Sequence, residues 1–149
     1  MFLNNLPILS FLILCWMLTI ADEFSQKKKI FPEFLSNNTL AGIMGILILF
    51  WGLFQFYANF NYLIYQFRFN YIVVILRFLV IIYFIVCGFV LTFKGFGKYL
   101  YTKNKRSQEN YQRTKEVLLP LQSILSKVGL LLIIINLVNY FLSMSKMEI

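Results

Sequence analysis

The chain has 149 residues, of which 60% are hydrophobic and only 13% are charged. A soluble domain of this length has too much surface to hide so many apolar side chains, so the composition excludes a soluble globular protein and indicates an integral membrane protein. Lysine and arginine outnumber the acids by 14 to 6, and histidine, the usual protein ligand of haem iron, copper or zinc, is absent from the sequence.

Four apolar runs are candidates for membrane-spanning helices. About 20 helical residues cross the ~30 Å of bilayer hydrocarbon, and the second and third runs reach that length easily. We therefore predict an all-α integral membrane protein with four transmembrane helices and a single transmembrane domain. The predicted helices cover residues 6–21, 40–60, 69–93 and 128–144, with inner loops at 22–39 and 94–127 and a short outer loop at 61–68.

The first run could instead be a signal peptide. Thr19, Ile20 and Ala21 offer small residues roughly where cleavage would occur. Against this interpretation, the residues before the run include no lysine or arginine, whereas a signal peptide begins with a positive segment. We expect a retained helix.

The second run begins with small residues that predict close helix packing. Ala41 and Gly45 are four residues apart, and Gly52 follows near the same face. Small residues let helix backbones approach closely in a bilayer, so this face should pack on another helix, of this chain or of a partner. Further along, half of the residues from Phe50 to Tyr71 are aromatic. This pattern is typical of an interfacial aromatic belt, and contact with a neighbouring subunit is the alternative.

The third run contains one charged residue, Arg77. It lies eight residues, or roughly 12 Å, from the start of the run, where a charge costs at least ~2.5 kcal/mol. Asn136 and Asn139 in the fourth run have a comparable predicted depth. We hypothesise that Arg77 donates to Asn136 or Asn139 and leaves its charge for a carboxylate of another subunit or a lipid phosphate. The alternative is that Arg77 snorkels to the outer headgroups.

Basic residues mark one side of the predicted topology. By the positive-inside rule, their position in the two inner loops puts both termini outside. They should also contact anionic lipid headgroups, whereas nucleic acid is not an expected partner because stacking aromatics are not interleaved with them. The predicted headgroup contacts are Lys27, Lys28, Lys29, Lys94, Lys98, Lys103, Lys105 and Arg106.

The end of the second inner loop, Val117 to Lys127, is amphipathic and contains Pro120. A proline bends a helix, so we expect this segment to lie on the inner surface before the fourth helix enters the membrane. Lys127 would then sit at the membrane boundary and snorkel. The alternative is a solvated loop followed by the start of a helix.

Residues with catalytic or metal-binding spacing are not found in the sequence. The six acids lie in predicted loops or tails, and Cys15 and Cys87 lie singly in apolar runs, where a thiol behaves as a small hydrophobe. We therefore predict no catalytic residue, no cofactor, no metal site and no enzymatic activity in this chain alone.

The chain is rich in Phe, Tyr, Ile, Asn and Lys, whose codons are AT-rich, and this overall composition resembles accessory membrane subunits encoded by mitochondrial or plastid genomes. The resemblance lies in composition and implies no functional residue. It implies a structural, accessory subunit of an energy-transducing complex of the respiratory-chain or ATP-synthase type, with other membrane subunits and anionic phospholipids as partners. The implied location is the mitochondrial inner membrane, with the plastid thylakoid or a bacterial inner membrane as alternatives. Two other functions stay open, a small oligomeric transporter or channel and a membrane assembly factor.

Overall fold

The fold was analysed in a computed structural model. The structure describes residues 5–28, 38–68, 71–100 and 105–145, and over these residues all regular secondary structure is α-helical. The helices are α1 (Asn5–Lys28), α2 (Asn38–Phe67), α3 (Tyr71–Leu100) and α4 (Lys105–Ser145).

Three of these helices contain stretches long and apolar enough to cross a membrane, and α1 contains a shorter apolar stretch. The stretches are Asn38–Asn61 in α2, Tyr71–Gly97 in α3, Gln108–Phe141 in α4 and Ile8–Ile20 in α1. The prediction of an all-α membrane protein is thus supported, with three to four helices able to span.

The helices extend further than the sequence predicts. The predicted outer loop 61–68 belongs to α2 as far as Phe67, and most of the predicted inner loop 94–127 belongs to the end of α3 and the beginning of α4. The predicted helix ends were placed where the apolar runs stop. These points are expected membrane boundaries, and the helices continue beyond them. Polar residues end an apolar run without breaking a helix, and α4 also continues through Pro120.

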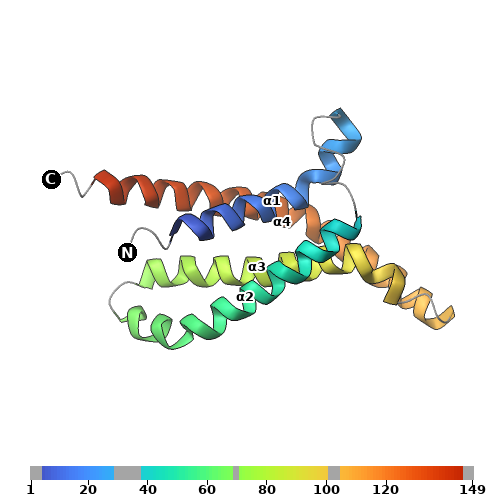
Figure 1. Cartoon of the computed structure of the whole chain (residues 1–149), viewed down its shortest axis with the longest axis horizontal. Coiled ribbons are helices and arrows are strands. Elements are labelled where there is room, and N and C mark those ends of the chain that lie inside the picture. The colour runs from blue at the N-terminus through green and yellow to red at the C-terminus, as the bar shows by residue number, and fades with distance from the viewer. Residues whose placement is uncertain (1–4, 29–37, 69–70, 101–104, 146–149) are drawn as a thin grey trace.

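The four helices run alternately in opposite directions, so that α1 begins and α4 ends at the same end of the molecule (Figure 1). We call this the termini end. At the opposite end, α1 and α3 finish while α2 and α4 begin. Helical lysines and arginines cluster there in the sequence, so we call it the basic end; they are Lys27, Lys28, Lys98, Lys105 and Arg106. Both predicted inner loops connect helices at this end.

The helices form two pairs, α2 with α3 and α1 with α4, and α3 also packs against α1 and α4 (Figure 1). The core contains side chains from all four helices, with Leu12, Leu18, Ile48, Phe84 and Leu91 among those fully buried. Because α3 contacts both members of the other pair, it joins the two halves of the bundle.

Glycines bring α2 and α3 into backbone contact. A Cβ atom on Gly45 would lie 2.5 Å from the backbone nitrogen of Thr92, and one on Gly88 would lie 2.5 Å from the backbone nitrogen of Leu49. A Cβ on Gly95 would overlap the Cα of Gly42. The approach of the two helices therefore depends on the absence of side chains along this line.

The midpoints of the apolar stretches of α1, α2 and α3 meet at one level of the bundle, and α4 reaches that level at Gly129. The midpoint of the apolar stretch of α3 is Phe84, and its neighbour Tyr83 touches Gly129 of α4. One turn further along α3, the Sγ of Cys87 lies 3.9 Å from the carbonyl oxygen of Cys15 in α1. On α2 the midpoint falls just after Leu49, which packs on α3 at Gly88. We call this level the middle layer. A bundle whose spans share a midpoint crosses a bilayer with that layer near its centre.

Substitution of Gly45 by alanine should destabilise the bundle. The added methyl group meets backbone atoms of α3, which cannot rotate away, and overpacking of this kind costs about 1–3 kcal/mol. The matched control is Gly97→Ala, where the nearest atoms, at 3.1–3.3 Å, belong to the side chains of Tyr111 and Phe93. Free energies of unfolding, measured in detergent micelles, should fall for the Gly45 variant and change by less than about 1 kcal/mol for the control. Equal losses would contradict the backbone contact.

Candidate functional site

Polar side chains gather where α1, α3 and α4 meet. Thr19 of α1 is buried, and its Oγ1 donates to the carbonyl oxygen of Trp16 at 2.7 Å. Gln122 of α4 donates from Nε2 to the carbonyl oxygen of Thr19 at 2.9 Å. We name this group the polar seam; it consists of Cys15, Thr19, Tyr83, Cys87 and Gln122. Its hydrogen bond between Gln122 and Thr19 ties α4 to α1 inside the bundle.

The other half of the polar seam contains two thiols and a phenol. Cys15 and Cys87 are free cysteines, fully buried, and the Sγ of Cys87 lies 3.9 Å from the carbonyl oxygen of Cys15. The buried hydroxyl of Tyr83 lies against Gly129, whose missing side chain makes room for it, and it has no partner within hydrogen-bonding geometry among the described residues. The seam can therefore hold helices together, and its five side chains include no carboxylate or imidazole for acid–base chemistry.

The sequence did not predict that the two cysteines meet. They are separated by 72 positions, and neither belongs to a local motif. Among the described side chains, three or more His, Cys, Asp or Glu residues do not come close enough together to hold a metal ion.

The helix-packing residues predicted in α2 lie on its side toward α3 or in the core. Gly45 and Gly52 pack on α3, the latter with its Cβ position 3.0–3.1 Å from atoms of Ile85 and Phe84. Ala41 is fully buried in the core cluster. The sequence left open whether the partner helix belongs to this chain; for the two glycines it is α3.

A row of large side chains protrudes from the part of α2 near the termini end. Each is more than half exposed, and Tyr57 reaches 86%. The row consists of Phe50, Phe54, Tyr57, Ile64 and Tyr65. We call it the aromatic row. It lies within the predicted aromatic stretch, on the side of α2 that faces away from the glycine contact with α3.

Other aromatic residues of this stretch are tied into the bundle. Trp51 stacks on Phe11 of α1 with ring centroids 5.3 Å apart, and Phe56 contacts Phe78 of α3 at 6.2 Å. The aromatic stretch thus divides into a packed set and the exposed aromatic row.

Arg77 and Asn136 lie at the same depth. The contact between Tyr83 and Gly129 gives a common reference level for α3 and α4. Toward the termini end, Arg77 is six residues from Tyr83 and Asn136 is seven residues from Gly129. Both therefore lie about 9–10 Å along the helix axis from this contact. Arg77 is half-buried, and Asn136 donates from Nδ2 to the carbonyl oxygen of Leu132 at 2.8 Å. Asn139 is exposed. The pairing of Arg77 with either asparagine stays a prediction.

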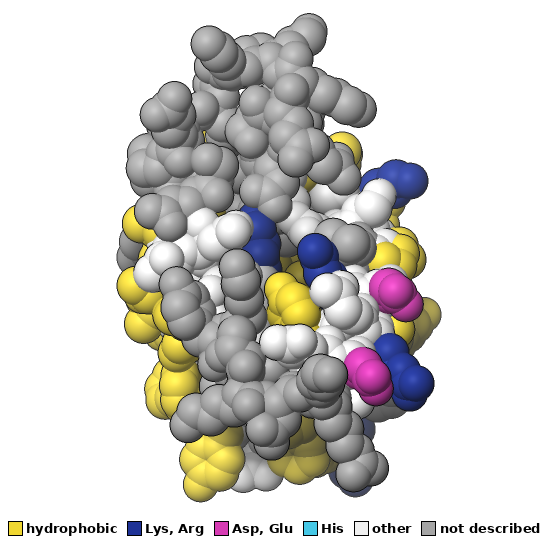
Figure 2. All heavy atoms as spheres, turned by 90° about the vertical axis from the view of Figure 1, so that its right-hand side faces the viewer, with side chains coloured by type: hydrophobic (Ala, Val, Ile, Leu, Met, Phe, Trp, Pro, Cys, Tyr) yellow, Lys and Arg dark blue, Asp and Glu magenta, His cyan; other side chains and the backbone are white. Residues whose placement is uncertain are grey.

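At the basic end, Figure 2 shows basic side chains together with acidic ones on the surface. Lys94 is half-buried, while Arg113 and Lys115 are exposed. For the other predicted headgroup residues, the side chains of Lys27, Lys28, Lys98, Lys105 and Arg106 and the whole of Lys29 and Lys103 lie outside the described part of the structure. The prediction that these residues contact anionic lipid therefore stays open.

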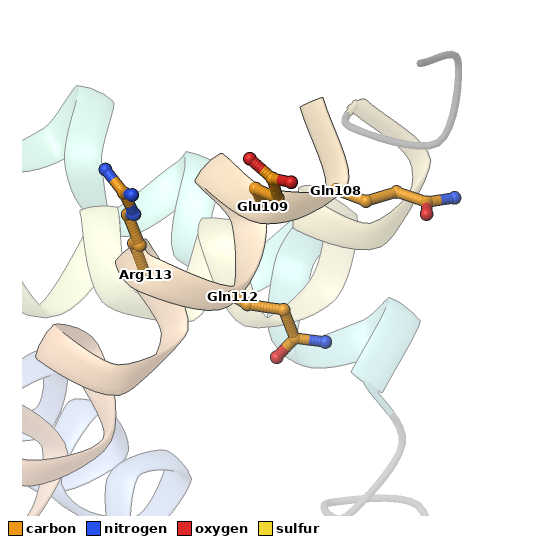
Figure 3. Close-up of a pocket in the computed structure, with 4 residues that line it drawn as sticks. All are labelled: Gln108, Glu109, Gln112 and Arg113. Carbon is orange, nitrogen blue, oxygen red and sulfur yellow. The ribbon is translucent and has the colours of Figure 1, made fainter. Parts of the chain in front are cut away.

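The beginning of α4 has a shallow hollow lined by Gln108, Glu109, Gln112 and Arg113 (Figure 3). All four residues are exposed, and the charged groups of Glu109 and Arg113 lie apart (Figure 3). An open hollow of this kind excludes little water. It is a solvated surface of the helix, and we assign no ligand to it.

Lys127 lies deeper than the sequence predicts. It is two residues, about 3 Å, from Gly129, which touches Tyr83 in the middle layer. Lys127 therefore belongs near the centre of the bundle and not at its boundary. In the sequence, polar residues near Lys127 mark the end of the apolar run. In the structure, the packing of α4 on α3 nonetheless places Lys127 inside the length of the bundle.

The chain matches no protein-family model, and neither the curated proteins nor the solved structures include a match.

The polar seam makes a prediction about substitutions at two of its members, Gln122 and Tyr83. Gln122→Leu removes the hydrogen bond to Thr19 and should cost about 0.6–1.7 kcal/mol, the range for interhelical hydrogen bonds in membranes. Tyr83→Phe removes a buried hydroxyl that has no hydrogen-bond partner among the described residues, so stability should stay equal or rise. Free energies of unfolding in detergent micelles test both. A larger loss for Tyr83→Phe than for Gln122→Leu would contradict these assignments.

Proposed function

We propose that the chain is a structural subunit of a multi-subunit, energy-transducing membrane complex of the respiratory-chain or ATP-synthase type. Four helices span the membrane, the basic end faces the inner side, and the location is the mitochondrial inner membrane. The AT-rich amino-acid usage supports an organelle-encoded chain. The midpoints of the apolar stretches support four spans, since the short stretch of α1 is centred on the same layer as the longer stretches of α2 and α3.

The observation that carries this proposal is the aromatic row on α2. Its side chains stand out from a helix whose other side is fixed to α3 by glycines. Aromatic side chains are rigid and large, and they are enriched in protein interfaces because they bury much area at a low entropic cost. Tyr57 also has a hydroxyl that needs a polar partner when it leaves water. A neighbouring subunit with complementary pockets satisfies both requirements.

A lipid-contacting role at the basic end accompanies the structural one. Exposed Arg113 and Lys115 lie on the first turns of α4, near the end of the apolar stretch of α3 at Gly97. Tyr111 packs on that end, with its ring 5.5 Å from the ring of Phe93. Each cation near an anionic membrane surface contributes about 1 kcal/mol of attraction.

A second candidate function is a small transporter or channel, and the polar seam favours it. The seam places thiol, hydroxyl and amide groups between helices, from the middle layer toward the basic end, and transporters bind their substrates near the membrane midplane. Cys15, Thr19 and Cys87 are at most 1% exposed, however, so the helices would have to separate to admit a substrate.

The proposed orientation predicts a protease pattern. Trypsin added to sealed membranes from the outer side should leave the segment from Lys94 to Lys115 intact, because both basic loops face inward. Opening the membranes with mild detergent should allow prompt cleavage in that segment. Cleavage there in sealed membranes would reverse the orientation.

Purification in mild detergent, followed by mass spectrometry of the co-purifying proteins, tests the function. A structural subunit should co-migrate with several different membrane proteins, in a fixed ratio of copies to the mature complex. A homo-oligomer free of other subunits would support the transporter. Presence only in immature assemblies would support an assembly factor and overturn the structural role.

A further inference from the structure

Lys127 is a charged side chain on an apolar helix face. Its neighbours on this face, Ile124, Val128 and Leu131, are 57%, 40% and 59% exposed. Lys127 is itself exposed, and it makes no hydrogen bond or ion pair with the described part of the chain. We call Ile124, Lys127, Val128 and Leu131 the Lys127 face.

The depth of the Lys127 face is set by packing on α3. Gly129 touches Tyr83, which is 12 residues from one end of the apolar stretch Tyr71–Gly97 and 14 residues from the other. This contact places Lys127 level with the middle of the apolar stretch of α3, and we infer that its ammonium lies near the centre of the bilayer.

Snorkelling does not bring the charge to water. A lysine side chain extends ~6 Å, whereas the centre of the hydrocarbon is ~15 Å from either headgroup layer. Intramembrane cations that persist in proteins are paired, and they mark functional contacts.

Among the described side chains, no acid lies close enough to Lys127 to supply the counter-charge. The sequences of α2 and α3 contain no Asp or Glu, and Glu116, the nearest acid in α4, is 11 residues or about 16 Å away along the helix. Asp22 and Glu23 belong to α1, which pairs with α4 through Gln122. Five residues turn a helix by 500°, so Lys127 points about 140° away from the side of Gln122.

We propose that the Lys127 face binds a transmembrane helix of a different subunit, and that this helix carries an Asp or Glu in the middle of the membrane. A carboxylate there would pair with the Lys127 ammonium while apolar side chains cover Ile124, Val128 and Leu131. A second copy of this chain does not fit, because it has no acid in the described part of its middle layer and would bring another Lys127. The proposal rests on the proposed function, since it requires a partner subunit.

The first experiment is zero-length coupling with dicyclohexylcarbodiimide, which is lipid-soluble and activates carboxyl groups inside membranes. The Lys127 Nζ would attack the activated carboxyl carbon and form an amide, while the carbodiimide takes up the carboxyl oxygen and leaves as dicyclohexylurea. The expected product is a peptide joining Lys127 to an Asp or Glu within an apolar stretch of another protein, identified by mass spectrometry. A Lys127→Arg chain should give no such product, since guanidinium is a poor nucleophile.

The second experiment compares three variants by co-purification of the coupled protein in mild detergent. Lys127→Leu should reduce recovery at least about tenfold, the effect of leaving a buried carboxylate unpaired. Lys127→Arg should retain recovery because it keeps the charge. Glu116→Gln, which removes the charge of an exposed residue on the same helix about 16 Å away along its axis, should also leave recovery unchanged.

Two results would overturn the proposal. Full recovery with Lys127→Leu and coupling only to lipid would assign the face to lipid, and coupling only to this chain would assign it to a second copy. In either case, other subunits that still co-purify with the chain would leave the proposed function standing. Purification of the chain without any other subunit would instead reject the proposed function itself.

Discussion

The arrangement of the molecule depends on the backbone contact between α2 and α3. Gly45, Gly88 and Gly95 let the two helices approach until main-chain atoms touch. In a bilayer, where apolar side chains gain little by leaving lipid, close van der Waals packing is the main force between helices. This contact fixes which side of α2 faces inward and so determines that the aromatic row faces outward. It also sets α3 in the position from which it reaches both α1 and α4.

Away from this contact, polar groups are satisfied mostly within their own helices. Thr19, Thr92 and Asn136 each donate to a carbonyl three or four residues earlier, and Asn59 donates to Gln55. Such bonds allow polar side chains at depth without requiring a neighbour. The hydrogen bond from Gln122 to the backbone of Thr19 is different because it joins two helices. The hydroxyl of Tyr83 and the exposed ammonium of Lys127 are not satisfied in this way within the described residues, and their positions require a tertiary explanation.

Much of the architecture could be predicted from the sequence, because continuous apolar runs report directly on membrane-spanning helices. The close-packing face of α2 was also accessible, since Gly45 and Gly52 carry a local signal. Their register against Gly88 and Gly95 was not, because it depends on a second helix far away in the chain. Helix ends were misplaced for another reason. Hydropathy indicates where an apolar run stops, but a helix can continue beyond that point. Thus α4 is one helix from Lys105 onward, and Pro120 lies inside it without ending it. Lys127 was assigned to the boundary because the amphipathic segment from Val117 to Lys127 was expected to bend at Pro120 and lie on the inner surface, and only the contact of Gly129 with Tyr83 reveals its depth. The meeting of Cys15 and Cys87 had no sequence signal at all.

The length of α4 has a mechanical consequence. A single helix of 41 residues is about 60 Å long, twice the thickness of the hydrocarbon layer, and it runs without a break from the charged turns at the basic end to the termini end. A helix is stiff along its axis, so a load applied to Arg113 or Lys115 at the surface reaches Gln122 and Gly129 as a shift of the whole rod. Pro120, which removes one backbone hydrogen bond of this rod, is the point at which such a load would turn into bending. The helix α4 therefore connects the charged residues at the basic end mechanically to the part of the bundle where Gln122 and Gly129 contact α1 and α3.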